Sequence, residues 1–180
     1  MSRDNKLVML ALFLWGSGEG MFLYILPLYM QQLGAAPQQV AEALAVAALL
    51  SACSFIPGGW LADRFDPKVI MIGGWALGGL ASIMMGLAGD WHAFIPGLLL
   101  YSLSFYCVPA INIYVTEAST APLAQTITLN FSAFAAGNII GPFVGGQLSE
   151  SIGTGIGVSF ALWAAWVLIS VFALARLFGG

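Results

Sequence analysis

The chain has 180 residues, of which 60% are hydrophobic and 13 are charged (8 acidic, 5 basic), and its mean hydropathy is +0.93. Soluble domains carry charge on about a quarter of their residues, so this composition excludes a soluble globular enzyme and a disordered tail. With a net charge of −3 and five scattered cations, it also excludes a nucleic-acid binder. The solvent for most of this chain must be lipid.

Apolar stretches long enough to cross a membrane follow one another along the chain. A helix needs about 20 apolar residues to span the hydrocarbon layer, and lipid requires every backbone amide to be satisfied within its own segment. The sequence therefore predicts an all-α membrane protein, with residues 1–180 forming a single transmembrane domain and no cleaved leader. The six predicted spans cover residues 7–30, 40–59, 69–89, 93–114, 123–148 and 156–178.

The basic residues predict the orientation. With six spans, all five cations fall on one side of the membrane, and the opposite loops carry none. Because cytoplasmic loops are enriched in Lys and Arg, we expect a multi-pass protein of the cell membrane with both termini in the cytoplasm. The cations are Arg3, Lys6, Arg64, Lys68 and Arg176.

Residues that could support metal or hydrolytic chemistry are few. Cys53 and Cys107 lie inside predicted spans without metal-ligand spacing, so buried thiols are expected, with no metal and no cofactor. An intramembrane hydrolase would need a serine with a histidine base inside the bilayer. The one histidine, His92, lies in a loop beside Asp90, so we predict that the protein is not an enzyme.

Two patterns recur in the two halves of the chain, which predicts two three-helix repeats. Because three spans reverse direction, the repeats would be inverted, as is typical of transporters. The first pattern is Gly-Gly-x-Leu-small-acid with a proline upstream, found at 58–63 after Pro57 and at 145–150 after Pro142. The second is Tyr-x-x-Pro, found from Tyr24 to Pro27 and from Tyr106 to Pro109.

Glu19 is the ionisable side chain at mid-depth in a predicted span. A carboxylate at the bilayer centre costs a few kcal/mol unless it is protonated, paired or facing water. No Lys, Arg or His lies at mid-depth in a span to pair with it, since Arg176 is two residues from the end of the sixth, so Glu19 is a candidate for proton coupling or for binding a cationic solute. A carboxyl hydrogen-bonded to a neighbouring helix is the structural alternative.

Aromatic and polar residues at helical spacing predict a cavity beside Glu19. Trp15 and Phe22 share its helix face, and Tyr101, Phe105 and Asn112 form a stripe in the fourth span together with Val108. The two faces together would make a partly aromatic, partly polar cavity. Ordinary helix–helix contact is the alternative for each single residue.

The fifth predicted span carries glycines every four residues, at Gly137, Gly141 and Gly145. Such a stripe lets another helix approach closely, and Pro142 removes a backbone donor within it, so we predict a contact and hinge surface. Asn130 and Asn138 would add interhelical hydrogen bonds or line a cavity.

Residues 59–68 hold the densest charge cluster of the chain, in a short loop between the second and third spans. One interpretation is topological, with cations holding the loop inside the cell. The other is a conformational latch formed by Gly59, Asp63, Arg64 and Lys68, in which Arg64 would meet Glu117 of the next loop on that side.

These motifs resemble the major facilitator superfamily, specifically its N-terminal six-helix half. The loop resembles the family motif Gly-x-Leu-Ala-Asp-Arg-x-Gly-Arg-Lys, with Asp66 and Pro67 as departures. The fifth span matches Gly-x-x-x-Gly-Pro-x-x-Gly-Gly, a motif typical of the family's proton-coupled drug exporters, although the fourth span lacks the Arg that many of them carry. The matching residues are Gly59, Leu61, Ala62, Asp63, Arg64 and Lys68, then Gly137, Gly141, Pro142, Gly145 and Gly146.

The resemblance implies a secondary transporter, an efflux antiporter that exchanges protons for neutral, lipophilic or cationic small molecules by alternating access. The family has twelve helices in two halves. By analogy the first and fourth helices would line the cavity, the second and fifth would face the other half, and the third and sixth would lie outside. The glycine stripe would then have no partner within the chain, and a second copy or another half-transporter would complete the cavity. A truncated or non-transporting membrane fragment or scaffold is the alternative function.

Overall fold

The computed structural model describes the backbone of residues 3–152 and the side chains of residues 5–147, and this part of the chain is helical without strands. The helices are α1 (Arg3–Leu23), α2 (Leu26–Gln32), α3 (Pro37–Ala62), α4 (Pro67–Gly86), α5 (Trp91–Ser104), the 3₁₀ helix η1 (Phe105–Cys107), α6 (Val108–Glu117) and α7 (Leu123–Ile152). They contain five segments long and apolar enough to cross a membrane. The sixth predicted span, 156–178, lies outside the described residues.

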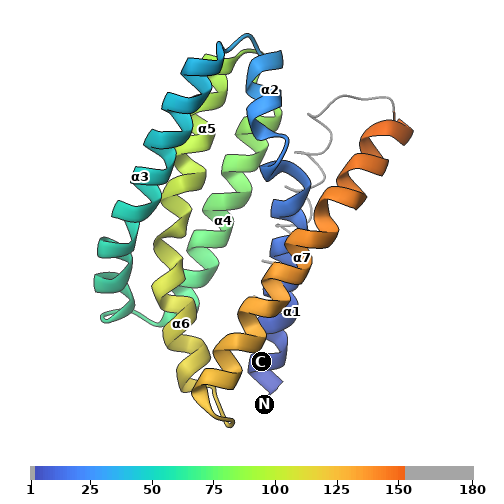
Figure 1. Cartoon of the computed structure of the whole chain (residues 1–180). Coiled ribbons are helices and arrows are strands. Elements are labelled where there is room, and N and C mark those ends of the chain that lie inside the picture. The colour runs from blue at the N-terminus through green and yellow to red at the C-terminus, as the bar shows by residue number, and fades with distance from the viewer. Residues whose placement is uncertain (1–2, 153–180) are drawn as a thin grey trace.

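The helices run alternately up and down, so the connecting loops gather at two ends of the bundle (Figure 1). At one end, the Trp91 amide donates to the Leu33 carbonyl at 3.2 Å, which joins the loops that follow α2 and α4. At the other end, the Lys68 ammonium lies 5.8 Å from the centre of the Tyr114 ring, which joins the start of α4 to the end of α6. Helix α1 begins at this same end (Figure 1). The described cations therefore share one end, as the hydropathy pattern predicted.

Both Tyr-x-x-Pro motifs interrupt a helix, so the predicted first span is two helices, α1 and α2. A proline clashes with the carbonyl four residues earlier and cannot donate a hydrogen bond. Accordingly α1 ends at Leu23, four residues before Pro27, and η1 begins at Phe105, four residues before Pro109. The other repeated pair, Pro57 and Pro142, lies inside unbroken helices. The repeated positions thus share their local structure.

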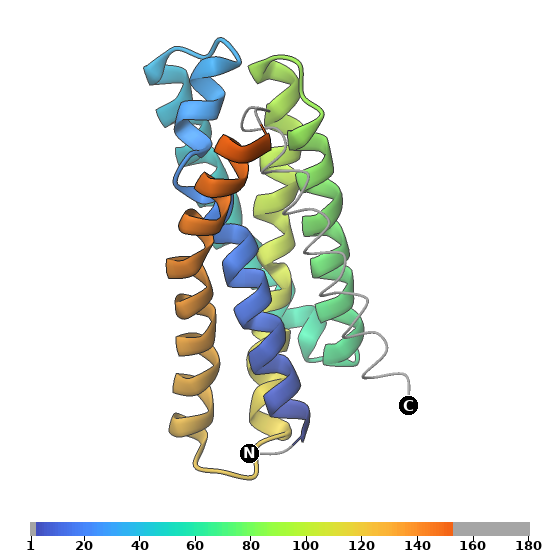
Figure 2. The same cartoon turned by 90° about the vertical axis from the view of Figure 1, so that its right-hand side faces the viewer.

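Close packing joins α1 to α7, which lie side by side in two perpendicular views (Figures 1 and 2). A methyl group on Gly137 would overlap the Phe13 carbonyl and lie 2.6 Å from the Ser17 amide nitrogen, and one on Gly141 would overlap the Ser17 carbonyl. One on Gly20 would lie 2.7 Å from the Asn138 carbonyl oxygen. The expectation that this stripe lacks a partner within the chain is therefore wrong, because α1 fills it.

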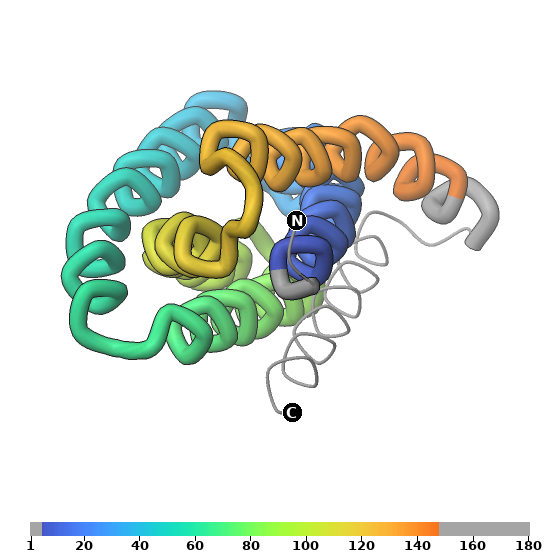
Figure 3. The backbone as a smooth tube through the Cα atoms, turned by 90° about the horizontal axis from the view of Figure 1, so that it is seen from below, coloured from blue at the N-terminus to red at the C-terminus, as the bar shows by residue number. Residues whose placement is uncertain are grey.

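The helices α3 and α7 have the least coverage. Only 17% of the apolar window of each is buried, against 50–56% for the other three spans. Seen along the bundle, both lie at its perimeter, whereas α6 is enclosed by its neighbours (Figure 3). Their exposed side chains include many large apolar ones, which lipid or another protein surface must cover. They include Val46, Leu49, Ile56 and Trp60 on α3 and Leu129, Ile139, Ile140 and Phe143 on α7.

Replacing Gly137 with alanine tests the contact between α1 and α7. Alanine favours helices over glycine by about 1 kcal/mol, but here the added methyl must push the helices apart, and overpacking costs about 1–3 kcal/mol. We expect Gly137→Ala to lower the melting temperature of the detergent-solubilised protein.

Gly146→Ala is the matched control, since nothing lies within 4 Å of the position of its methyl group. It should leave the melting temperature unchanged or raise it. Equal melting temperatures for the two variants would contradict the packing.

Candidate functional site

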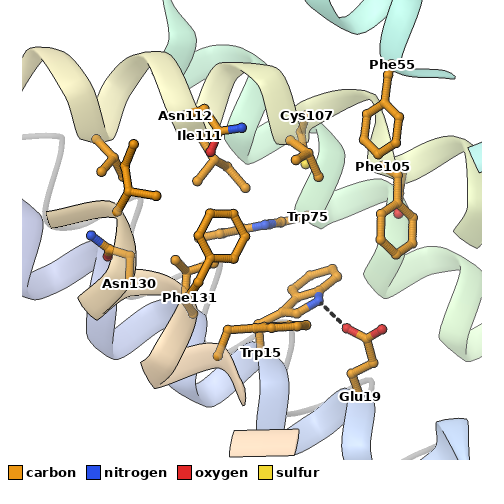
Figure 4. A pocket seen from close by; sticks show the side chains of 16 residues that line it. Trp15, Glu19, Phe55, Trp75, Phe105, Cys107, Ile111, Asn112, Asn130 and Phe131 are labelled. Atoms are coloured by element: carbon orange, nitrogen blue, oxygen red, sulfur yellow. Dashed lines mark hydrogen bonds between the residues drawn. The ribbon is translucent and has the colours of Figure 1, made fainter. Parts of the chain in front are cut away.

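A cavity of about 220 Å³ lies inside the bundle, with walls from every long helix of the described residues (Figure 4). Its lining is mainly apolar and aromatic, as is usual for small-molecule sites. The lining residues are Leu12, Trp15, Glu19, Phe55, Trp75, Ser104, Phe105, Cys107, Val108, Ile111, Asn112, Val115, Ile127, Asn130, Phe131 and Phe134.

Glu19 is the charged side chain of this lining, which contains no Lys, Arg or His. Its residue is 7% exposed, and its carboxyl accepts a hydrogen bond of 3.1 Å from the Trp15 indole nitrogen, one turn earlier on α1. Four-residue spacing places the two side chains on one helix face. The site therefore presents a single acidic group within an aromatic wall.

The Trp15 ring stacks on Trp75 of α4, with centroids 5.8 Å apart and planes 25° from parallel. Gly78 makes room for this pair, because a methyl group there would lie 2.8 Å from the Trp15 ring. The expectation that the third span lies outside the cavity is wrong at this point, since Trp75 forms part of the wall.

Not every predicted cavity residue reaches the cavity. Trp15, Phe105 and Asn112 line it, whereas Phe22 and Tyr101 pack behind the wall. The Tyr101 ring meets the rings of Phe22 and Phe105 edge-on, with centroids 5.6 Å and 5.4 Å apart, and its side chain also interacts with Glu19. Phe22 and Tyr101 therefore support the lining residues from behind.

The first half of α7 contributes three lining residues that the sequence analysis did not predict, Ile127, Phe131 and Phe134, beside Asn130, for which cavity lining was one of two interpretations. Ile127, Asn130, Phe131 and Phe134 follow the i, i+3, i+4, i+7 pattern of a single helix face. That spacing is visible in the sequence and indicates one common helix face, but the glycine stripe that follows it favours a contact surface for the whole span.

The two cysteines have different surroundings. Cys107 is 4% exposed and lines the cavity, whereas Cys53 is exposed on the thinly covered α3, so the expectation of a buried thiol is wrong for Cys53. Among the side chains of residues 5–147, no three His, Cys, Asp or Glu residues gather in a group that could hold a metal ion.

The predicted latch residues lie at one end of the bundle. The Arg64 guanidinium lies over the Trp60 ring, 4.2 Å from its centre, and forms no ion pair with the exposed Glu117 in the described structure, so that predicted contact is wrong. Trp60 lies four residues before Arg64, so its ring is within reach of the guanidinium group. Lys68 instead approaches α6, over Tyr114. Asp63 is exposed at the end of α3. A methyl group added at Gly59 would meet nothing within 4 Å.

Comparison with curated proteins finds relatives with transport functions. The chain is 28% identical over 158 residues to multidrug resistance protein MdtG of Escherichia coli O6:K15:H31 (strain 536 / UPEC), covering 84% of this chain and 38% of MdtG. It is 28% identical over 174 residues to inner membrane transport protein YnfM of Escherichia coli (strain K12), covering 93% and 40%. The chain thus spans about 40% of the length of these relatives.

Solved structures share the fold. A POT family transporter in complex with 5-aminolevulinic acid superposes with a TM-score of 0.86 at 18% sequence identity, covering 99% of this chain and 38% of that one. A peptide transporter POT (E310Q mutant) in complex with alafosfalin gives 0.86 at 19% identity, covering 98% and 38%. The chain therefore has half of a major facilitator fold. The family profile described as Major Facilitator Superfamily matches residues 8–179. The chain belongs to the major facilitator superfamily of membrane transporters.

Proposed function

We propose that this chain forms one half of a secondary transporter of the cell membrane, which exports neutral, lipophilic or cationic small molecules in exchange for protons. The observation that carries the proposal is Glu19, the charged group of an aromatic cavity that contains no basic residue among its lining. The name of MdtG, a multidrug resistance protein, supports export as the direction of transport.

The position of Glu19 suggests how exchange would work. A buried carboxylate without a cationic partner is costly in a membrane, so it must bind either a proton or a cation. A single carboxyl cannot hold both at the same time. Competition between proton and cationic solute at Glu19 would therefore couple the uptake of one to the release of the other, as the bundle opens to either side in turn.

The charged loop supports a role in that opening. Lys68 lies over Tyr114 and so bridges the start of α4 and the end of α6, while Arg64 lies over Trp60 at the end of α3. Together with Gly59, Asp63 and Glu117, these residues would hold one end of the bundle closed. In this proposal, cation–aromatic contacts replace the ion pair that the sequence predicted.

A second half would complete the cavity. The apolar faces of α3 and α7, and the cavity residues Phe55 and Phe131 that are themselves exposed, are suited to a protein partner. That partner would be another six-helix half or a second copy of this chain.

Gradient-driven flux of ethidium in sealed proteoliposomes tests the role of Glu19. We expect wild-type protein to export ethidium when a pH gradient is applied, and Glu19→Gln to reduce this flux to that of protein-free vesicles, because glutamine cannot exchange a proton. Glu42→Gln is the matched control, since Glu42 is an exposed carboxylate that accepts from Gln38 at 2.8 Å; it should retain flux.

Equal flux in wild type and Glu19→Gln would contradict the proposed coupling. Absence of any gradient-driven flux in the wild type would contradict the transport function and favour the non-transporting scaffold.

Single cysteines at positions 64 and 90 test the orientation, in a background with Cys53→Ser and Cys107→Ser. The proposed topology places Arg64 in the cytoplasm and Asp90 outside, so a membrane-impermeant maleimide added to intact cells should label Asp90→Cys alone. Labelling of both positions, or of Arg64→Cys alone, would contradict it.

A further inference from the structure

We infer that the indole N–H of Trp75 on α4 is a hydrogen-bond donor to the solute, and that the cavity selects organic cations that also carry a carbonyl oxygen. This inference rests on the proposed function, because it takes the cavity as the solute site, and it adds the acceptor group by which the site would select among cationic solutes.

Trp75 holds a fixed position in the cavity wall. It lines the cavity although its residue is only 2% exposed. Its ring stacks on Trp15, with centroids 5.8 Å apart and planes 25° from parallel, and Gly78 on the next turn of α4 leaves room for the stack. The indole is therefore in place before any solute arrives.

The N–H of this indole has no acceptor among the residues that the structure describes. An indole nitrogen can only donate, and a buried one usually finds a partner. The Asn130 oxygen also lacks a partner but has essentially no accessible surface, whereas the Trp75 nitrogen is not closed off in this way. Figure 4 shows this nitrogen (blue) near the middle of the lining side chains, between Trp15 and Ile111.

The group that satisfies this N–H must therefore be an acceptor inside the cavity. A water molecule can fill that place while the cavity is empty of solute. A solute that displaces the water without supplying an acceptor loses the hydrogen bond, whereas one with a carbonyl oxygen restores it. The buried N–H thus discriminates between solutes of the same shape.

The other N–H and O–H donors of the lining place no such demand on a solute. The Trp15 indole is occupied by the carboxyl group on its own helix. The Ser104 hydroxyl and the Asn130 amide nitrogen donate to backbone carbonyl groups of their own helices, at 2.6 Å and 2.9 Å. Asn112 is exposed, so its amide is not confined to a partner in the cavity. Trp75 is the buried donor whose hydrogen bond depends on the solute.

Glu19 and Trp75 present complementary groups on two stacked rings. Because the carboxyl oxygen is bonded to the Trp15 nitrogen at 3.1 Å and the two indole centroids are 5.8 Å apart, this oxygen and the Trp75 nitrogen are at most about 13 Å apart. The carboxylate would bind a cationic group, the N–H an oxygen, and the aromatic faces the carbon chain between them.

The cation (4-oxopentyl)trimethylammonium fits these demands. Its nitrogen and oxygen are up to about 6 Å apart, and contacts of about 4 Å to the carboxylate and about 2.9 Å to the indole extend its reach to about 13 Å. Its flexible chain also spans shorter separations. In its isostere, (4-methylpent-4-enyl)trimethylammonium, a methylene group replaces the carbonyl oxygen, so the two cations differ only in the acceptor.

Equilibrium dialysis of the whole chain in lipid nanodiscs against each cation tests the inference. We expect wild-type protein to bind the ketone about five- to tenfold more tightly than the more apolar alkene, as one hydrogen bond allows. Trp75→Phe keeps an aromatic face but has no N–H, and should bring this ratio to about one or below. Trp91→Phe should keep the ratio, because it makes the same change at an indole that does not line the cavity.

The infrared spectrum of the bound ketone gives a second measurement, which needs no variant. A hydrogen bond weakens the carbonyl double bond, so the carbonyl stretch of the ketone bound to wild-type protein should lie at a lower wavenumber than in an aprotic solvent. Trp75→Phe should abolish this shift, whereas Trp91→Phe should preserve it.

Equal binding of the two cations by the wild type, an unchanged ratio in Trp75→Phe, or a bound ketone without the infrared shift would overturn the role of Trp75 and leave the transport proposal intact. If Trp75→Phe does not fold, the two wild-type measurements decide. Failure of the wild type to bind either cation would overturn the inferred solute class. The proposed function fails separately, on the absence of ethidium flux in vesicles.

Discussion

The close packing of α1 on α7 is the contact on which the cavity depends. Gly16 and Gly20 on one helix and Gly137 and Gly141 on the other bring backbone against backbone, where any side chain would overlap a carbonyl group. Without a hydrophobic driving force between helices in lipid, such close approach is what makes association favourable. The resulting parallel register determines which residues of α1 and α7 line the same cavity.

The chemistry of that space is one-sided. Its one ionisable carboxyl group is that of Glu19, its body is mainly aromatic, and no basic residue lines it. A stack of Trp15 on Trp75 holds the indole that donates to Glu19, which fixes the carboxyl at the cavity wall. Aromatic faces attract cations as well as apolar surfaces. The Glu19 carboxyl group can therefore serve both proton exchange and the binding of lipophilic ammonium ions.

Much of this architecture was predictable from composition and spacing. Five of the predicted spans exist, and the repeated Tyr-x-x-Pro motif interrupts a helix in both halves, because a proline acts on its own backbone wherever it occurs. What could not be predicted is which faces meet. Periodicity places Phe22 and Trp15 on the side of Glu19, but only the packing of α4 and α5 puts Trp75 in the wall and Phe22 behind it. Likewise, the charge of Arg64 does not predict that its guanidinium group lies over the Trp60 ring.

The central claim is that Glu19 lies in a solute-accessible cavity and that proton and solute compete for it. Dicyclohexylcarbodiimide reacts with protonated carboxyl groups in apolar surroundings, and mass spectrometry locates the adduct. The account predicts modification of Glu19 in the reconstituted protein, and protection by excess benzyltrimethylammonium, a cation that cannot itself react with the reagent. Failure to modify Glu19, or modification unaffected by the cation, would contradict it.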